Sequence, residues 1–91
     1  MYQKWVGSQF KTDLKSYIHL PHIIDRIDIA IDLLSQGHIL APEFRDHPLK
    51  WAFTGIRECH ISPDILLMYE IDKKKWIIYL VRIGSHSELF G

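Results

Sequence analysis

The chain has 91 residues, 47% of them hydrophobic and 24% charged, and its 11 basic residues balance 11 acidic ones. One globular domain spanning residues 1–91 fits this length and composition, which exclude a disordered chain, and no apolar run approaches the roughly 18 residues of a membrane helix. A neutral chain argues against a protein that lives on phosphate backbones, although the six histidines can add charge in an anionic site, and no DNA binding by the protein itself is expected. A lone cysteine, Cys59, without a signal-peptide pattern makes the cytoplasm the expected location.

The N-terminal half predicts a short strand followed by two helices. Residues 2–6 have the composition of a strand, and Ser8 is placed to cap a first amphipathic helix of about three turns. Pro21 ends that helix and begins a second one, which Gly37 stops. Apolar side chains recur at helical spacing in both segments: Phe10, Leu14, Tyr17 and Ile18, then Ile23, Ile27, Ala30 and Leu34. The short link predicts an antiparallel helical hairpin.

The C-terminal half predicts strands. Three β-rich runs cover residues 51–61, 65–71 and 76–83, and their short connections favour an antiparallel meander to which the N-terminal strand can add. The expected fold class is therefore α+β, with the two-helix hairpin packed on one face of a mostly antiparallel sheet of three or four strands. The last two runs are apolar on both alternating sets, so both faces of the sheet should be covered. Because the helices cover only one, we expect a partner to cover the other.

Three polar segments that interrupt the apolar pattern contain the candidate chemistry, namely residues 46–49, 57–64 and 84–90. They supply three imidazoles and a carboxylate: His47, His60, His86 and Asp64. Imidazoles titrate near neutral pH and both accept and donate protons, which favours acid–base catalysis. The same set suits zinc or nickel, although the tight ligand spacings of zinc sites are missing. The structural alternative is a turn that begins at Asp64 beside a half-exposed His60.

Two arginines and the cysteine complete the candidates. Arg57 and Arg82 fall on or beside predicted strands, where a guanidinium needs an anion or solvent, and Glu58 is the simplest partner for either. Cys59 is expected to be a small buried residue rather than a nucleophile.

Several segments in the same order and spacing resemble the YafQ branch of the RelE toxins: residues 46–49, 55–64, 67–69 and 82–90. The close match lies in the C-terminal half. The resemblance implies the toxin of a type II toxin–antitoxin pair, an mRNA interferase that enters the ribosomal A site, cuts mRNA there and so inhibits translation. It further implies a cognate RelB/DinJ-like antitoxin as partner, and no metal or other cofactor.

The resemblance also places functional roles on residues. The family's catalytic positions fall on His47, His60, Asp64 and His86, and its C-terminal aromatic at the active site falls on Phe90. We add Arg57 and Arg82 as RNA phosphate contacts, on charge and neighbourhood.

The implied reaction is attack of the RNA 2′-hydroxyl on the adjacent phosphorus. His86 is assigned as the acid, Asp64 with His60 as the base, and His47 with Arg82 as phosphate stabilisers. Two other functions stay open: a ParE-like toxin that acts on a protein target such as gyrase without cutting RNA, and a small histidine metal-binding module.

Overall fold

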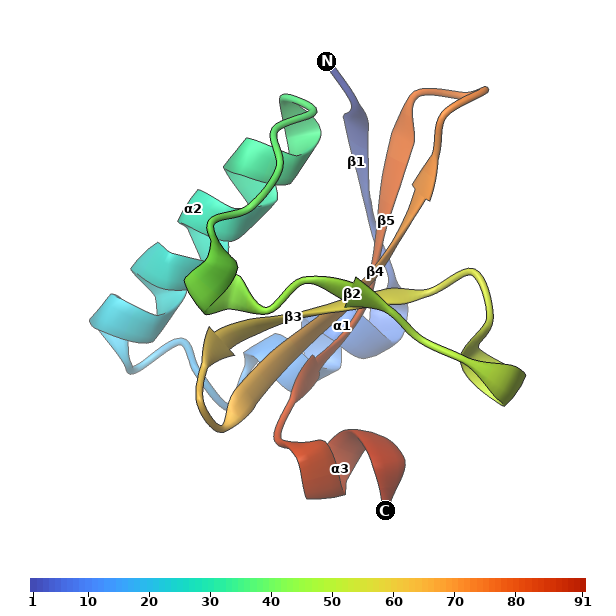
Figure 1. Cartoon of the computed structure of the whole chain (residues 1–91). Coiled ribbons are helices and arrows are strands. Elements are labelled where there is room, and N and C mark those ends of the chain that lie inside the picture. The colour runs from blue at the N-terminus through green and yellow to red at the C-terminus, as the bar shows by residue number, and fades with distance from the viewer.

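Five strands form one mixed sheet with helix α2 lying across one face (Figure 1). The computed structural model describes all 91 residues. In chain order the elements are β1 (Gln3–Val6), α1 (Ser8–Leu14), α2 (Pro21–Ser35), the 3-10 turn η1 (Pro42–Phe44), β2 (His47–Pro48), the 3-10 turn η2 (Trp51–Phe53), β3 (Arg57–Ser62), β4 (Ile65–Asp72), β5 (Ile77–Gly84) and α3 (His86–Phe90). None of the helices combines the length and the apolar composition needed to cross a membrane.

The sheet confirms the α+β class but not the strand count. The strand order is β1-β5-β4-β3-β2, with the predicted antiparallel meander formed by β3, β4 and β5. The N-terminal strand joins the sheet in parallel, pairing Gln3 with Ile77, and the two-residue β2 adds a fifth strand where a loop was expected. The predicted strand over residues 51–61 is too long. Its first part forms η2, and Gly55 turns the chain at a φ of 94° before β3 begins.

The predicted helices differ in how well they match. α2 has the predicted bounds, with Pro21 in its first turn and Gly37 in the left-handed conformation just beyond it. The first helix is shorter than expected, because α1 ends at Leu14 and Ile18 is 67% exposed. Ser8 lies within α1, and Gly7 is its N-cap without a side-chain hydrogen bond. The two helices contact different strands, α1 mainly β5 and α2 mainly β3, rather than forming a simple hairpin.

The main hydrophobic core lies between α2 and the sheet. The α2 stripe contributes Ile27, Ala30 and Leu34, each at most 3% exposed. They pack against side chains from the three meander strands, all of them buried: Cys59, Ile61, Leu67, Tyr69, Ile78 and Leu80. Burial of a large apolar side chain contributes about 1.5–3 kcal/mol, so this layer is the larger of the two sources of hydrophobic stabilisation.

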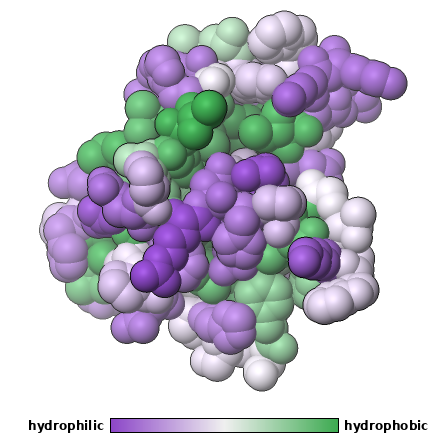
Figure 2. Space-filling view, in the orientation of Figure 1, coloured by the Kyte–Doolittle hydropathy of each residue, from purple (hydrophilic) through white to green (hydrophobic).

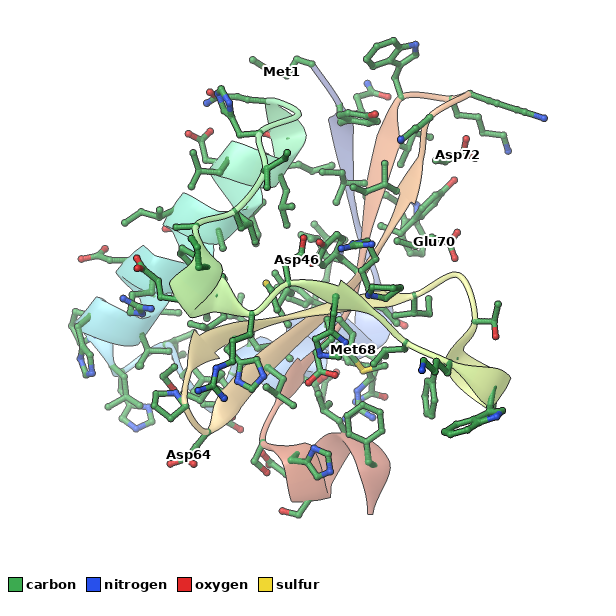
Figure 3. The ribbon with its side chains drawn as sticks, in the orientation of Figure 1. Met1, Asp46, Asp64, Met68, Glu70 and Asp72 are labelled. Atoms are coloured by element: carbon green, nitrogen blue, oxygen red, sulfur yellow. The ribbon has the colours of Figure 1, made fainter.

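A smaller core covers the opposite face of the sheet. Leu66 and Met68 of β4 are buried there beneath Leu89 of α3. Met68 lies toward the side on which α3 packs (Figure 3). Partly buried side chains complete the cluster: Leu49, Ile56, Val81 and Phe90. The chain itself therefore covers the centre of this face with α3 and the segment before β3, so the apolar pattern of β4 and β5 does not by itself require a partner there.

The open edge of β5 is closed by a side chain from α1. The pairing of β1 with β5 ends at Leu80. Beyond that point the Asp13 side chain, instead of a strand, accepts hydrogen bonds from β5. Its carboxylate accepts a hydrogen bond from the Ile83 N–H at 3.1 Å and two from Arg82 at 2.8 and 3.0 Å. Burial by itself raises the pKa of Asp13, but the bonds from Arg82 and Ile83 outweigh it and hold the pKa below its ordinary value.

We expect Asp13→Asn to lower the free energy of unfolding by about 1–3 kcal/mol at pH 7, because Arg82 and the Ile83 N–H lose a charged acceptor. The pKa of Asp13 is lower in the folded protein than in the unfolded chain, where it is about 3.9. Its carboxylate therefore stabilises the fold fully above that value, and this stabilisation is lost as the pH falls through the lower, folded-state pKa. Urea unfolding at neutral pH and near pH 3 should therefore show a smaller difference from the parent in acid. Asp28→Asn, at an exposed position of α2, is the control. Equal destabilisation at both pH values would contradict the electrostatic account.

Candidate active site

Two of the predicted histidines meet a buried glutamate on the face of the sheet opposite α2. His47 of β2 is paired with Glu58 of β3 in the register, and His60 shares their face because alternate strand residues point the same way. The ligating atoms of these three side chains all lie within 4.8 Å of one another. Glu58 is 6% exposed and its Oε2 is 3.7 Å from His47 Nε2. Glu58 therefore partners a histidine, and the prediction that it pairs with an arginine is wrong.

The third histidine is held by the short helix α3. The Ser85 hydroxyl accepts a hydrogen bond from the Glu88 N–H at 3.2 Å, and the Glu88 carboxylate accepts one from the Ser85 N–H at 2.8 Å. This capping box fixes where the helix begins, and the bond from Ser85 keeps the pKa of Glu88 below its ordinary value. His86 occupies the first turn. Its ring lies 4.9 Å from that of Phe90, which in turn contacts Phe53 edge-on at 5.2 Å.

Two pockets on this face share His86 as a common wall. His60, Asp64 and His86 line the first, which we call the turn pocket because it opens beside the turn between β3 and β4, where Figure 3 shows Asp64. His47, Glu58 and His86 line the second, the aromatic pocket, together with Lys50, Trp51, Phe53 and Phe90. The structure thus brings together all four predicted catalytic residues and Phe90. Their catalytic roles stay predictions.

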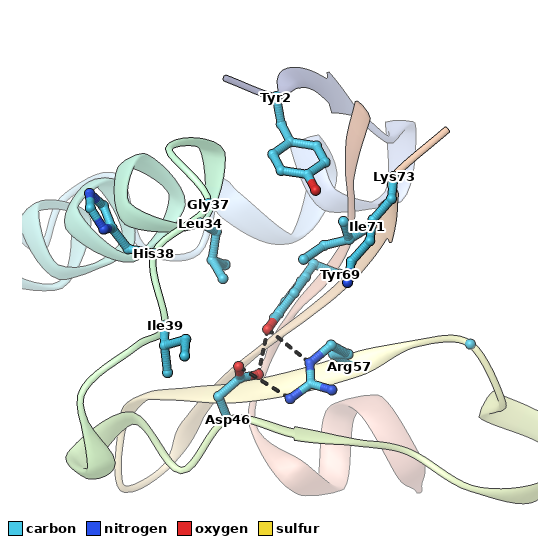
Figure 4. A pocket seen from close by; sticks show the side chains of 11 residues that line it. Tyr2, Leu34, Gly37, His38, Ile39, Asp46, Arg57, Tyr69, Ile71 and Lys73 are labelled. Carbon is cyan, nitrogen blue, oxygen red and sulfur yellow. Dashed lines mark hydrogen bonds and ion pairs between the residues drawn. The ribbon is translucent and has the colours of Figure 1, made fainter. Parts of the chain in front are cut away.

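The two predicted arginine contacts are not part of this cluster. Arg57 points to the α2 face, where its Nη2 lies 3.3 Å from Asp46 Oδ2 and its Nε donates to the Tyr69 hydroxyl at 3.4 Å (Figure 4). Arg82 is bound by Asp13, as described above. A role of either arginine in RNA binding stays a prediction, but both guanidinium groups already have protein partners.

The network around Arg57 supports the site from the α2 face of the sheet. The Tyr69 hydroxyl donates to Asp46, and burial raises the pKa of Tyr69, so this phenol keeps its proton. Asp46 is thereby anchored on the α2 face while His47, the next residue, emerges on the other. This network forms the base of a separate pocket on the α2 face, lined partly by Tyr2 and Ile39. Figure 2 shows a hydrophobic band in this area, between α2 and the β4–β5 hairpin.

The only cysteine is not a nucleophile. Cys59 is fully buried beneath α2, and burial raises the pKa of its thiol to about 12. This confirms the expectation of a small core residue.

Comparison with known proteins identifies the family. Residues 2–91 match the family model described as the bacterial toxin of the type II toxin–antitoxin system, YafQ. The chain belongs to the YafQ toxin family.

Individual YafQ relatives agree over nearly the whole chain. The mRNA interferase toxin YafQ of Escherichia coli strain B/BL21-DE3 is 30% identical over 86 residues, which are 93% of this chain and 91% of that protein. Among solved structures, a metal-bound toxin from Helicobacter pylori is 39% identical with a TM-score of 0.90, covering 99% of this chain and 100% of that one. YafQ in the Escherichia coli DinJ–YafQ complex is 26% identical, with a TM-score of 0.87 over the full length of both chains. The predicted YafQ resemblance is confirmed, and it extends beyond the C-terminal half.

Several residues of this YafQ-family site were missed from the sequence. Lys50, Trp51 and Phe53 line the aromatic pocket, and Arg45 lies beside His60 in a neighbouring hollow. A basic residue next to exposed aromatics is a typical pattern of single-stranded nucleic-acid binding. The sequence predicts a strand over residues 51–61, in which neighbouring side chains would point to opposite faces. That prediction hides the pattern of a basic residue beside aromatic ones.

Proposed function

We propose that this YafQ-family toxin is a ribosome-dependent mRNA interferase, an endoribonuclease that cuts mRNA in the ribosomal A site and so inhibits translation. The observation that carries the proposal is the meeting of three imidazoles and a carboxylate, from separate segments, around two pockets that share His86. The name of the Escherichia coli relatives, mRNA interferase toxin YafQ, supports the same activity.

The chemistry uses the 2′-hydroxyl of the message as nucleophile. A base removes the hydroxyl proton, the 2′-oxygen attacks the adjacent phosphorus, and the bond from phosphorus to the 5′-oxygen breaks as an acid protonates that oxygen. The products carry a 2′,3′-cyclic phosphate and a 5′-hydroxyl. His60 and His86 both line the turn pocket, so a phosphate bound there lies between two proton-transfer groups. We assign His60 with Asp64 as the base and His86 as the acid.

Positive charge near the phosphate must come from this face of the sheet, because developing negative charge on the phosphoryl oxygens needs stabilisation. His47 is the predicted contact, and the structure favours Lys50 and Arg45 in place of Arg82. Lys50 lines the aromatic pocket with His47, and Arg45 lies beside His60. Positive charges placed this way can stabilise the phosphate locally, although the net charge of the whole chain is zero.

Cleavage of ribosome-bound mRNA tests the proposal. The purified toxin should cut an A-site codon, and a 2′-O-methyl group on the nucleotide that supplies the nucleophile should abolish cutting there. A chelator that removes transition metals but spares Mg²⁺ should leave the rate unchanged. Cleavage of the methylated message at the unmodified rate would exclude the 2′-hydroxyl mechanism.

A cognate antitoxin is the proposed protein partner. The YafQ of Escherichia coli has been solved in a toxin–antitoxin complex with DinJ, and the similarity of this chain to that toxin supports a DinJ-like partner here. Covering His86 and the two pockets would keep RNA away from the acid and the base, which is sufficient for silencing.

Metal binding is a second candidate function. His47, Glu58 and His60 offer two imidazoles and a carboxylate within 4.8 Å of one another, a donor set suited to zinc or copper. Toxins of Helicobacter pylori have been solved in metal-bound and copper-bound forms. A metal held here would occupy the imidazole nitrogens needed for proton transfer, so the chelator result separates this function from cleavage.

A further inference from the structure

Trp51 combines an exposed apolar side chain with a strained backbone conformation. Its side chain is 89% exposed, and its backbone is in the left-handed region at a φ of 54°. A bulky residue in that region is a steric outlier, and an exposed indole leaves a large apolar surface in water. Such outliers persist where the surroundings hold them, and they cluster at ligand-binding and active sites.

The other two tryptophans of the chain are used differently. Trp5 contacts the ring of Tyr79 at 5.5 Å between centroids, and Trp76 contacts Tyr2 at 5.1 Å. Trp76 also has a positive φ, 57°, but its ring partner gives it a packing role. Trp51 has no aromatic partner in the chain, so both faces of its indole are available.

The surroundings of Trp51 favour a nucleotide as the occupant. The aromatic pocket that it lines also contains Phe53, Phe90 and His86. Lys50, the preceding residue, lines the same pocket and supplies a cation. An aromatic face beside a cation matches a base joined to a phosphate, and base stacking on aromatic side chains is the usual way in which proteins hold single-stranded RNA. Glu58 also lines this pocket, but it is 6% exposed and its carboxylate lies 3.7 Å from His47 Nε2, so the Lys50 ammonium remains available to a phosphate.

We propose that Trp51 is a stacking platform for one nucleobase of the mRNA, next to the scissile phosphate, with Lys50 on the phosphate of that nucleotide. The inference rests on the proposed function and deepens it, because it assigns a substrate-binding contact outside the histidine cluster. Stacking is sequence-tolerant, since every base has a π face, so it holds the strand without selecting one codon.

A titration with programmed ribosomes tests the platform under single-turnover conditions. Trp51→Ala should raise the half-saturating toxin concentration by about 5- to 140-fold, the range expected for one lost stack. The maximal rate should stay near that of the parent, because stacking binds substrate and transition state alike. Trp51→Phe should restore most of the affinity. Trp51→Gly should bind as weakly as Trp51→Ala yet melt no lower than the parent, because glycine accepts a positive φ.

Trp76→Ala is the matched control, since it removes an exposed tryptophan of positive φ from the turn between β4 and β5, which lines neither pocket of the site, and it should titrate like the parent. A parental titration curve for Trp51→Ala would overturn the inference. An equal loss of affinity for ribosomes whose message ends before the A site would also overturn it, because the contact would then be with ribosomal RNA. A variant that lost affinity only for the antitoxin would overturn it too. Absence of cleavage by the parent protein would instead overturn the proposed function, and this inference with it.

Discussion

His86→Ala should slow cleavage of ribosome-bound mRNA by about 10²- to 10⁴-fold, the usual effect of losing a general acid or base, while the fold stays intact. His86 is exposed in the first turn of α3, and its ring contacts that of Phe90. The residue therefore contributes little to the core, and an exposed substitution of this kind changes stability by less than about 0.5 kcal/mol. Single-turnover cleavage and thermal melting by circular dichroism measure the two quantities separately.

His22→Ala is the matched control for this experiment. His22 is also exposed, but it lies at the start of α2, away from both pockets of the site. Its loss should leave the cleavage rate unchanged. If the His86→Ala protein melts like the parent and cleaves at the parental rate, the role of His86 as the acid is wrong.

Leu34→Ala should act through stability instead, lowering the free energy of unfolding by about 2–5 kcal/mol. Leu34 is 3% exposed on the α2 stripe and packs against the sheet, so truncation leaves a cavity that its neighbours fill only partly. For a small domain this is a large share of the total stability. Urea unfolding should show the shift in midpoint, and activity should fall only under conditions in which the protein unfolds.

Ile29→Ala on the same helix provides the comparison for the core substitution. Ile29 is 53% exposed, and its truncation should cost less than about 0.5 kcal/mol. Alanine is the better helix former at both positions, so a similar loss at both would contradict the account that burial against the sheet sets the contribution of Leu34.

The sequence predicts best those elements whose apolar pattern is long. α2 has a stripe of four turns between Pro21 and Gly37, and β4 and β5 are continuous apolar runs, so each was assigned nearly at its observed bounds. β2 consists of two residues, one of them Pro48, and it exists only because β3 pairs with it. No local pattern encodes such a contact.

Helix α3 and the location of Arg57 did have a signal in the sequence. Ser85 and Glu88 have the spacing of a capping box, which predicts the start of a helix three residues ahead of Glu88. Strand alternation separates Arg57 from His60, since residues three apart on a strand point to opposite faces. The three histidines and Asp64 were candidates from their polar segments alone, and the family resemblance assigned them catalytic roles. The aromatic pocket was missed because Trp51 and Phe53 lie in a 3-10 turn where a strand was predicted.

The parallel pairing of β1 with β5 sets the order in which the toxin becomes complete. Gln3 is synthesised long before its partner Ile77, and α3 with His86 follows later still. Contacts this distant in sequence form late, because the intervening loop must be closed first. A chain synthesised only as far as β4 therefore has neither a closed sheet nor its proposed acid.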